Sequence, residues 1–360
     1  MVGAPRRGTP DVPHTDDHLD ELARLADTAG AEVVGRLVQR IDAPTPNLYL
    51  GAGKVEELKC LVAEKGATLV LFDEELSPVQ GKNLETALGV RLMDRAELIL
   101  DIFATRARSN EARMQVELAQ LEYLLPRLAR MWVHLSRIRG GIGLRGPGET
   151  QIETDRRMIR TKISRLKTKL KDAERHRSLL RQGRQRRQVP TVALVGYTNA
   201  GKSSLLRALT GAQTLVEDRL FATLDTLTRE TDIGGGRRVR LVDTVGFIRK
   251  LPHHLVASFR ATLEEAERAD ILVHVVDASH PQWEDHVLVV DQVLRELGVD
   301  PSNVIHAFNK MDRVAEPEAF GQRVTSRFPA VACISAAKGE VGELVALLRL
   351  ASAPELATGS

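Results

Sequence analysis

The residues best suited to chemistry form one short stretch, Gly196-Tyr197-Thr198-Asn199-Ala200-Gly201-Lys202-Ser203. An apolar run, Thr191–Val195, precedes it, and a helix-like segment follows it. The two glycines let backbone N–H groups converge on one oxyanion, and Lys202 adds a positive charge for the β- and γ-phosphates. Ser203 offers a hydroxyl to Mg²⁺. The alternative is a chance glycine turn, but the strand–loop–helix context predicts a phosphate-binding loop and a nucleoside triphosphate ligand.

A second segment is expected to sense the γ-phosphate. It reads Phe221-Ala222-Thr223-Leu224-Asp225 and precedes a predicted strand, Thr228–Ile233. Thr223 is placed to complete the Mg²⁺ shell when a γ-phosphate is present and to release it after hydrolysis. A surface-loop threonine is the alternative interpretation, and Thr226 or Thr228 are substitutes for this role.

A third segment follows the predicted strand Val239–Val242 and reads Asp243-Thr244-Val245-Gly246. We expect the Asp243 carboxylate to hold the metal through water and the Gly246 N–H to contact the γ-phosphate. The predicted catalytic residues are therefore Lys202, Thr223 and Gly246, and the predicted metal-binding residues are Ser203, Thr223 and Asp243.

Nucleotide identity depends on Asn309-Lys310-Met311-Asp312, which follows the apolar run Val304–Phe308. A carboxylate at Asp312 accepts hydrogen bonds from guanine N1–H and from its 2-amino group. Adenine offers neither donor and would leave the charge unpaired. Ser335-Ala336-Ala337 is expected to close over the base with backbone N–H groups. Together, the ordered motifs predict GTP rather than ATP.

The residue after Gly246 is Phe247, where many small GTPases place a glutamine that orients the attacking water. Phenylalanine cannot orient water, and Arg219 and Arg229 are only nearby candidates for an arginine finger. We therefore predict slow hydrolysis by the isolated chain and faster hydrolysis when a partner orders the switch loops.

The elements that position these motifs belong to an α/β protein with a P-loop domain at 191–352 and a tail at 353–360. A small N-terminal α/β domain with a largely parallel sheet is predicted at 18–108, after a disordered tail at 1–17. Its expected elements are the strands Glu32–Gln39, Thr68–Asp73 and Val90–Met93 and the helices Val55–Lys65, Pro78–Leu88 and Arg95–Thr105. Gly51-Ala52-Gly53-Lys54 resembles a phosphate loop but lacks its spacer, which favours a tight turn.

A long antiparallel helical hairpin is predicted at 109–182. Apolar residues recur at heptad spacing along both arms: Met114, Leu118, Leu121, Leu125, Leu128, Trp132 and Leu135, then Ile159, Ile163, Leu166, Leu170, Ala173 and Leu180. Pro126 predicts a kink near Tyr123. The tip, Gly140–Glu149, holds five glycines in nine positions, which permits close approach to another surface.

The return arm of this hairpin is strongly basic. Between Arg156 and Arg187 there are fourteen Lys or Arg residues against only Asp172 and Glu174. A solvated helix face is the alternative, but such a face normally mixes charge signs. Because aromatic residues make up only 4% of the chain, the pattern favours contact with the backbone of structured RNA, without DNA as a partner. A flexible linker is expected at 183–190.

Composition sets broad limits on the remaining possibilities. The 360 residues carry a net charge of +3, and the length predicts two or three domains. Cys60 and Cys333 are isolated and are expected to be buried thiols in a reducing compartment. No apolar stretch is long enough to span a membrane, and no signal peptide is recognisable. We expect a cytoplasmic monomer, with peripheral membrane association left open.

With these residues in view, the chain resembles the HflX family of ribosome-associated GTPases over about residues 30–350. The resemblance is carried by Gln115-Val116-Glu117-Leu118-Ala119-Gln120-Leu121, by the glycine tip, by Phe221–Asp225 and by Asp243–Gly246. It implies an α/β domain, a hairpin that reaches into the large ribosomal subunit, and a Mg²⁺-dependent GTPase domain. It further implies splitting of stalled or idle ribosomes, notably under heat stress.

The chain departs from this family at three places. Thr226-Leu227-Thr228 stands where the family usually has proline and then threonine, and Ala96-Glu97 stands where it commonly has threonine. Many relatives also carry a C-terminal domain beyond the segment that matches Glu340–Leu350. Two other functions remain open: a ribosome-assembly switch, and an RNA remodeller that uses ATP in the N-terminal domain.

Overall fold

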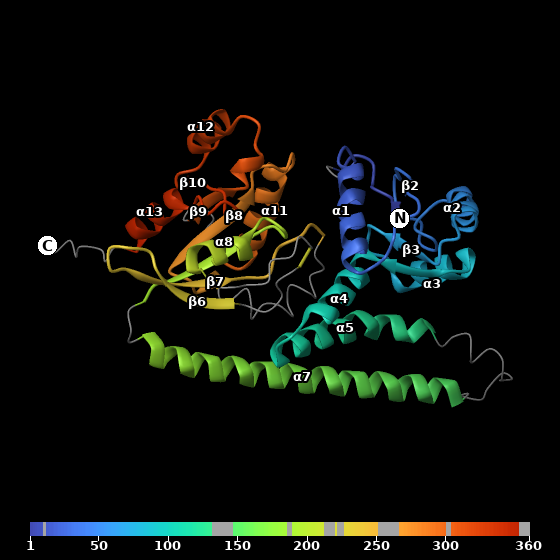
Figure 1. Cartoon of the computed structure of the whole chain (residues 1–360). Coiled ribbons are helices and arrows are strands. Elements are labelled where there is room, and N and C mark those ends of the chain that lie inside the picture. The colour runs from blue at the N-terminus through green and yellow to red at the C-terminus, as the bar shows by residue number, and fades with distance from the viewer. Residues whose placement is uncertain are drawn as a thin grey trace. The chain divides into compact units, whose positions relative to one another are not determined.

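The computed structural model describes residues 1–9, 12–131, 147–185, 189–211, 220–221, 227–250, 266–299 and 304–352. These residues fall into two compact units, each treated by itself (Figure 1). The first unit comprises Met1–Thr105 and Arg113–Lys171, and the second comprises Arg106–Ala112 with the chain from Asp172 onward. No described helix combines the length and the apolar composition needed to cross a bilayer.

A four-stranded parallel sheet organises the first unit, in the order β2-β1-β3-β4. Its strands are β1 (Val2–Gly3), β2 (Leu37–Val38), β3 (Leu69–Phe72) and β4 (Arg91–Asp94), and its helices are α1 (Thr15–Thr28), α2 (Ala52–Lys65), α3 (Pro78–Leu88) and α4 (Arg95–Arg106). Local chemistry explains where α3 starts, because Ser77 and Gln80 form a reciprocal capping box before the first turn. The predicted alternation of strands and helices and the parallel sheet are confirmed.

The predicted disordered tail at 1–17 is wrong. β1 lies between β2 and β3, Val2 and Ala4 are fully buried, and the Met1 amino group donates to Gly35 O at 2.7 Å. α1 then begins at Thr15, inside the predicted tail. The prediction was based on average composition, which does not reveal a strand of two residues. This strand gains hydrogen bonds on both sides and buries Val2, and these gains offset the entropy lost when the segment is ordered. The strand predicted at Glu32–Gln39 shortens to Leu37–Val38.

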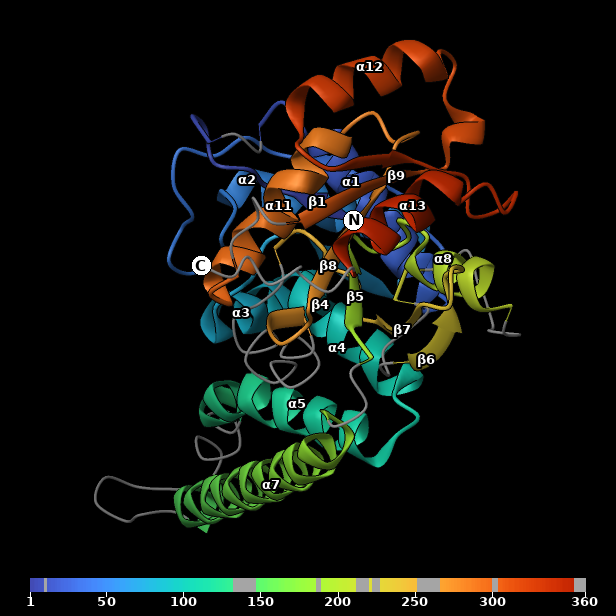
Figure 2. The same ribbon diagram turned by 90° about the vertical axis from the view of Figure 1, so that its left-hand side faces the viewer.

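Two long helices run side by side in the first unit, as Figures 1 and 2 both show: α5 (Asn110–Met131) and α7 (Pro147–Gln185). Lys162 of α7 pairs with Glu117 of α5 at 2.5 Å, and Lys167 pairs with Glu122 at 2.7 Å. Leu118 of α5 and Leu166 of α7 are buried, so these two residues of the predicted seams face inward. The glycine tip up to Gly146 lies outside the described residues.

A six-stranded sheet organises the second unit, in the order β10-β9-β8-β5-β7-β6. Its strands are β5 (Thr191–Gly196), β6 (Leu227–Asp232), β7 (Arg238–Asp243), β8 (Ile271–Asp277), β9 (Val304–Asn309) and β10 (Val331–Cys333). Only the pairing of β6 with β7 is antiparallel among these described strands. The helices are α8 (Lys202–Thr210), α11 (Trp283–Glu296), α12 (Pro317–Arg327) and α13 (Gly342–Ala351).

Helices cover both faces of this sheet. Alternate residues of β5 point to opposite sides: Val192 and Leu194 pack with α8 and α13, whereas Ala193 and Val195 pack with α11. α11 and α12 share a further apolar cluster around Phe308. The sheet is therefore buried on both faces, as expected for parallel strands, and its carboxyl edge is left to carry polar groups.

Two smaller predictions from the sequence need correction. Residues 183–185 of the predicted linker belong to α7, which continues to Gln185. Cys60 is exposed and Cys333 is half-buried, so neither is the buried thiol that was predicted. Cys60 lies on the outer face of α2, where helical periodicity turns it away from the core.

Candidate nucleotide site and cationic helix

The predicted phosphate loop lies between the end of β5 and the start of α8. Gly196 has φ 151°, and a Cβ there would lie 2.2 Å from Val275 O. Gly201 has φ 96°, and a Cβ there would lie 2.2 Å from Asn309 Nδ2. Both positions therefore require glycine, for backbone conformation and for space. The loop opens α8 at Lys202, so the N-terminus of that helix faces the space where phosphate is expected to bind.

Lys202 is buried beneath this loop. Its Nζ donates to Gly196 O at 3.1 Å and to Tyr197 O at 3.0 Å. Burial lowers the pKa of Lys202 to about 8, although the Asp243 carboxylate acts in the opposite direction. The ammonium is thus poorly solvated, and its present acceptors are neutral carbonyl groups. A hydrogen bond to an anionic phosphate would be stronger than these contacts, so the arrangement favours phosphate binding by Lys202.

A pair of oxygen groups beside the loop is suited to a hard cation. Ser203 Oγ donates to Asp243 Oδ2 at 2.6 Å, and Asp243 is fully buried at the end of β7. Thr244 Oγ1 donates to Leu194 O at 2.8 Å, which anchors the following turn to β5. A hydroxyl and a buried carboxylate on adjacent elements are the donor types that Mg²⁺ prefers, so the residues present fit this ion.

Gly246 and Phe247 close against the phosphate loop. Thr198 N donates to Phe247 O at 2.6 Å, and Phe247 N donates to Gly196 O at 3.0 Å. A Cβ on Gly246 would lie 2.7 Å from Thr198 Cα and 3.0 Å from Lys202 Nζ. Phe247 itself is buried with Ala193 and Val195 in the core under α11. Its ring is therefore unavailable to a reacting water.

The residues predicted to recognise guanine, Asn309–Asp312 and Ser335–Ala337, also contact the phosphate loop, through Asn309. Buried Asn309 donates through Nδ2 to Ala200 O at 2.9 Å and accepts at Oδ1 from Ala336 N at 2.9 Å. Ser335 Oγ donates to Asp312 Oδ1 at 2.6 Å, and this bond lowers the pKa of Asp312. Asp312 is exposed, and its lowered pKa keeps the carboxylate ionised near neutral pH. The Ala336 N–H thus orients the Asn309 side chain in this structure, and the expected closure of Ser335-Ala336-Ala337 over the base stays a prediction.

The structure brings together most of the predicted site, but not every residue. Of the second predicted segment, only Phe221 is described, and its N–H donates to Thr198 Oγ1 at 3.0 Å. Ala222, Thr223, Leu224, Asp225 and Thr226 lie outside the described residues, as does Arg219. Thr228 and Arg229 are exposed on β6. The assignment of Thr223 to the metal and γ-phosphate stays a prediction.

Sequence reasoning missed two groups at this edge. Asp277 ends β8 and accepts from Lys310 Nζ at 2.6 Å, and Lys310 itself has a left-handed backbone conformation at φ 64°. Arg249 donates its backbone N–H to Tyr197 Oη at 2.9 Å and its guanidinium to Gln282 at 3.1 Å. The sequence did contain a signal for Asp277. It ends the largely apolar strand β8, in the same way that Asp243 and Asn309 end their strands.

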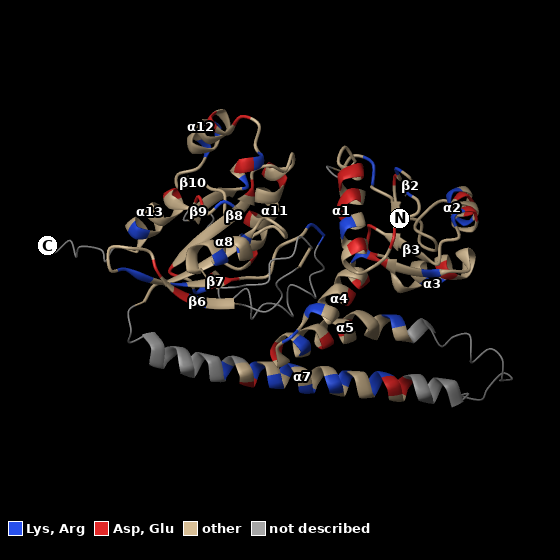
Figure 3. Cartoon of the chain, in the orientation of Figure 1, with Lys and Arg blue, Asp and Glu red and all other residues tan. Residues whose placement is uncertain are grey.

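A separate cationic surface lies along α7 in the first unit (Figure 3). Its members are exposed and none forms an ion pair with another described residue: Arg157, Arg160, Arg165, Lys169 and Lys171. The neighbouring Lys162 and Lys167 are held by carboxylates of α5. The helix therefore presents uncompensated positive charge to solvent, which is the electrostatic requirement for binding a phosphate backbone.

Comparison with known families divides the chain into three matching regions. Residues 16–104 match the model described as GTP-binding GTPase N-terminal, and residues 106–184 match the GTP-binding GTPase Middle Region. Residues 191–310 match the model described as 50S ribosome-binding GTPase. The matched regions thus include the phosphate loop, Asp243–Gly246 and Asn309–Lys310.

Individual relatives agree with these regions. The GTPase HflX of Caldanaerobacter subterraneus subsp. tengcongensis is 54% identical over 83% of this chain and 70% of its own length. The GTPase HflX of Escherichia coli K12 is 46% identical over 84% of this chain and 71% of its own. A solved complex of SsGBP and GDP is 25% identical, covers 98% of both chains and has a TM-score of 0.51.

Proposed function

The chain belongs to the HflX family of GTPases, and from that premise we propose that it is a Mg²⁺-dependent GTP hydrolase that splits stalled or idle ribosomes under stress. In this proposal it works in the cytoplasm as a monomer and binds the rRNA of the large subunit. One observation carries the proposal: the same chain contains a sheet edge with the residues suited to guanine recognition and a helix, α7, with exposed cations that form no ion pair with other described residues.

The nucleotide roles follow from the contacts at the sheet edge. We assign Lys202 and the backbone N–H groups of Gly196–Ser203 to the β- and γ-phosphates, and the Gly246 N–H to the γ-phosphate. The Asp312 carboxylate, oriented by Ser335, is assigned to guanine N1–H and the 2-amino group. Lys310, anchored on Asp277, is assigned to the face of the base.

Metal binding completes this proposal. Ser203 and, through water, Asp243 would hold Mg²⁺, and Thr223 would join them when a γ-phosphate is present. The ion would neutralise charge that develops on the phosphate oxygens. Ser203 would then lose its hydrogen bond to Asp243, and ligation of the ion would replace that contact.

Hydrolysis is expected to be slow in the isolated chain and faster on the ribosome. Phe247 is buried in the core and cannot orient water, so a second component must supply or order that group. The measurement is the single-turnover rate of GTP hydrolysis with and without large subunits. An unchanged rate at saturating subunits would contradict activation by the ribosome.

Light scattering of intact ribosomes tests the splitting activity directly. Addition of the chain with a non-hydrolysable GTP analogue should lower the scattering signal, and the GDP-loaded chain should lower it less, because only a difference in affinity between the two states makes a switch. If the chain cosediments with large subunits but leaves scattering unchanged, a role in subunit assembly replaces splitting.

The contribution of α7 is tested with matched triple variants. Arg157→Gln, Arg160→Gln and Arg165→Gln together should weaken binding to large subunits and make its salt dependence shallower by about two to three in the log–log slope. The control is Arg24→Gln, Arg40→Gln and Lys59→Gln, which removes three exposed cations of the same unit. Equal weakening by both triples would indicate unspecific attraction and would contradict a binding role for α7.

A further inference from the structure

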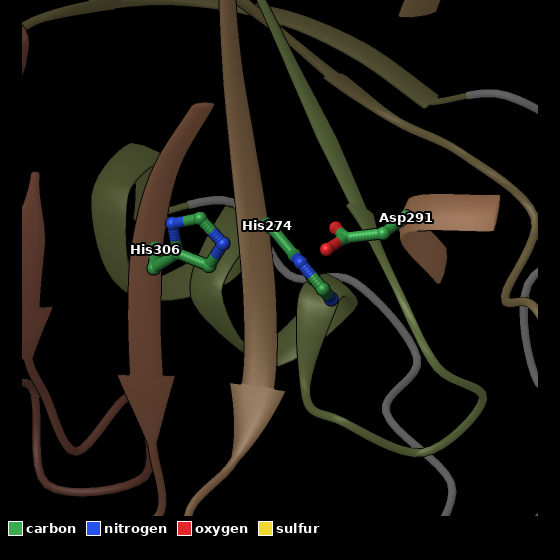
Figure 4. Close-up of side chains that lie close together, drawn as sticks. All are labelled: His274, Asp291 and His306. Carbon is green, nitrogen blue, oxygen red and sulfur yellow. The ribbon is translucent and has the colours of Figure 1, made fainter. Parts of the chain in front are cut away.

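Three polar side chains meet inside the second unit, on the side of the sheet away from the phosphate loop's helix. His274 of β8 and His306 of β9 are adjacent across the parallel pair, and Asp291 lies opposite them on α11. Figure 4 shows His274 between the other two, with the Asp291 carboxylate and the His306 ring both directed toward it. One ligand atom from each lies within 4.8 Å of the other two.

This position is one where the sequence pattern otherwise places apolar residues. Leu272 and Val276 flank His274 on the same face of β8, and Val304 and Phe308 flank His306 on β9; all four are buried in the α11-side clusters. Two histidines therefore replace aliphatic side chains in the layer between sheet and helix. Burying polar groups there is unfavourable unless they find partners.

One buried polar atom of each of these three residues lacks such a partner within the described protein. His274 and His306 are 1% and 3% exposed, and the Nδ1 atom of each makes no hydrogen bond. Asp291 Oδ1 is also buried without a partner. Three buried polar atoms without partners, brought together from three elements, are rare in a folded core, and a bound ligand offers these residues a common partner.

We propose that His274, His306 and Asp291 form a binding site for a late first-row divalent cation, with Zn²⁺ as its redox-inert representative. Two imidazole nitrogens and one carboxylate oxygen are typical ligands for zinc, whereas Mg²⁺ and Ca²⁺ prefer oxygen alone. The inference goes beyond the nucleotide function and concerns a second ion at a different place.

The protonation state of the histidines supports this site. Burial, followed by the nearby His306, Lys202 and His286, lowers the pKa of His274 well below its ordinary value. Burial lowers the pKa of His306 to about 4, against a backbone hydrogen bond at Val304. Both rings are thus neutral near pH 7, which is the form that ligates metals.

The geometry requires a small contraction on metal binding. Tetrahedral zinc places its ligand atoms about 3.4 Å apart, so side chains now within 4.8 Å must close by about 1.4 Å at most. Asp291 is half-buried and lies on a helix, which permits this approach and admits the ion and a water as the fourth ligand.

The location gives such a site a structural consequence. His274 and His306 are paired in register, and three residues further along the same strands Asp277 is paired with Asn309. These two residues hold Lys310 and the phosphate loop. An ion that clamps β8, β9 and α11 would therefore stiffen the strand ends that carry the guanine motif.

Competition between the full-length, tag-free chain and a chromogenic zinc chelator tests the proposal. Excess Mg²⁺ and GDP are present to occupy the nucleotide site. We expect one Zn²⁺ per chain, and zinc should raise the unfolding temperature where additional Mg²⁺ does not. A folded chain that retains no zinc under these conditions would overturn the proposal whatever the variants do.

Matched variants locate the ion. Asp291→Asn should bind zinc at least about tenfold more weakly, since even indirect ligand partners contribute that much. Glu296→Gln removes an exposed carboxylate from the same helix and should bind as the parent does. His306→Phe should also lose the ion, and the half-buried Asp291 variant decides the matter if the phenylalanine variant does not fold.

Thiols are the obvious competing ligands, so the chain with Cys60→Ala and Cys333→Ala is included and should keep its zinc. Loss of zinc in that double variant would overturn the proposal. Equal affinities in the Asp291 and Glu296 variants would overturn it as well. Neither result bears on GTP hydrolysis, which depends on other residues.

Discussion

Two loops of this chain place a glycine directly before a lysine at the start of a helix, yet they differ in almost every contact. Lys202 is buried and donates to two loop carbonyls, whereas Lys54 pairs with Glu57 of its own helix at 2.8 Å. Gly201 has φ 96° and no room for a Cβ, whereas Gly53 has open space around it. The comparison shows that the spacing and surroundings of a Gly-Lys pair, and not the pair itself, make a phosphate site.

The carboxyl edges of the two sheets differ in the same way. In the first unit, buried Arg95 donates to Asp73 at 2.7 Å and also to Glu21, so the charges at this edge neutralise one another. In the second unit, Lys202 donates to two loop carbonyls and Asp312 accepts from Ser335, and neither forms an ion pair with another described residue, although Asp243 lies near Lys202 and Lys338 and Arg313 lie near Asp312. One edge is complete without a ligand, while the other is suited to receive one.

Arg95→Met offers the largest effect. It leaves the Glu21 and Asp73 carboxylates buried without their cation, so unfolding of the first unit should become easier by about 3–5 kcal/mol. Denaturant unfolding measures this change, and GDP affinity should stay as in the parent. The control Arg91→Met breaks an exposed pair with Glu97 and should cost less than about 1 kcal/mol. A loss of GDP affinity in the Arg95 variant would contradict the division of roles between the two edges.

Lys202→Ala and Lys54→Ala compare the two loops directly. Removal of Lys202 should lower the rate of GTP hydrolysis by at least about 10²-fold, because a preorganised charge at the phosphates is lost. Lys54→Ala should leave GTP hydrolysis within about twofold, since its charge is compensated by Glu57. Rates under saturating GTP distinguish the two variants. ATP hydrolysis that survives in the Lys202 variant would favour an ATP-using N-terminal domain.

Gly201→Ala and Gly53→Ala should change stability in opposite directions. Alanine at 201 must adopt a positive φ and displace the Asn309 side chain, at a cost of about 1–3 kcal/mol. Alanine at 53 lies in a helix with space around it and should stabilise by about 0.5–1 kcal/mol. Thermal unfolding of each variant measures both signs. Equal destabilisation would show that the first loop is also conformationally constrained.

The pH dependence of nucleotide binding extends the comparison to the charge of the lysine itself. Lys202 must be protonated to pair with phosphate, and its pKa in the free chain is about 8. GDP affinity should therefore fall by about tenfold between pH 7 and pH 9. Lys202→Arg stays charged and should show a flatter profile, which separates this effect from titration of the base.

The folding stability of the nucleotide-free chain should change with pH in the opposite direction to its GDP affinity. The unfolded chain keeps the Lys202 proton up to about 10.5, whereas the folded chain releases it near 8. Burial of the charged lysine thus destabilises the nucleotide-free chain below pH 8, and this penalty is relieved as the pH rises toward 10.5. Nucleotide-free Lys202→Met should lack this contribution in thermal unfolding over the same range.

Local patterns were sufficient to predict the nucleotide edge of the second unit. The phosphate loop, Asp243–Gly246 and Asn309–Asp312 each follow a strand, and parallel strands bring their carboxyl ends to one edge whatever lies between them. The buried seam residues Leu118 and Leu166 and the basic character of α7 could likewise be predicted, because heptad spacing and charge are properties of neighbouring residues.

Other features were decided only by tertiary structure. β1 is two residues long and becomes a strand because Val2 pairs with both Leu37 and Phe72. Asn309 meets Ala200 across 109 residues, and the pairing of Asp277 with Lys310 needs two strands in register. His274, His306 and Asp291 carry no recognisable spacing at all. Sequence determines the geometry of a residue's own loop or helix, whereas which distant groups share a buried space depends on strand register and helix packing.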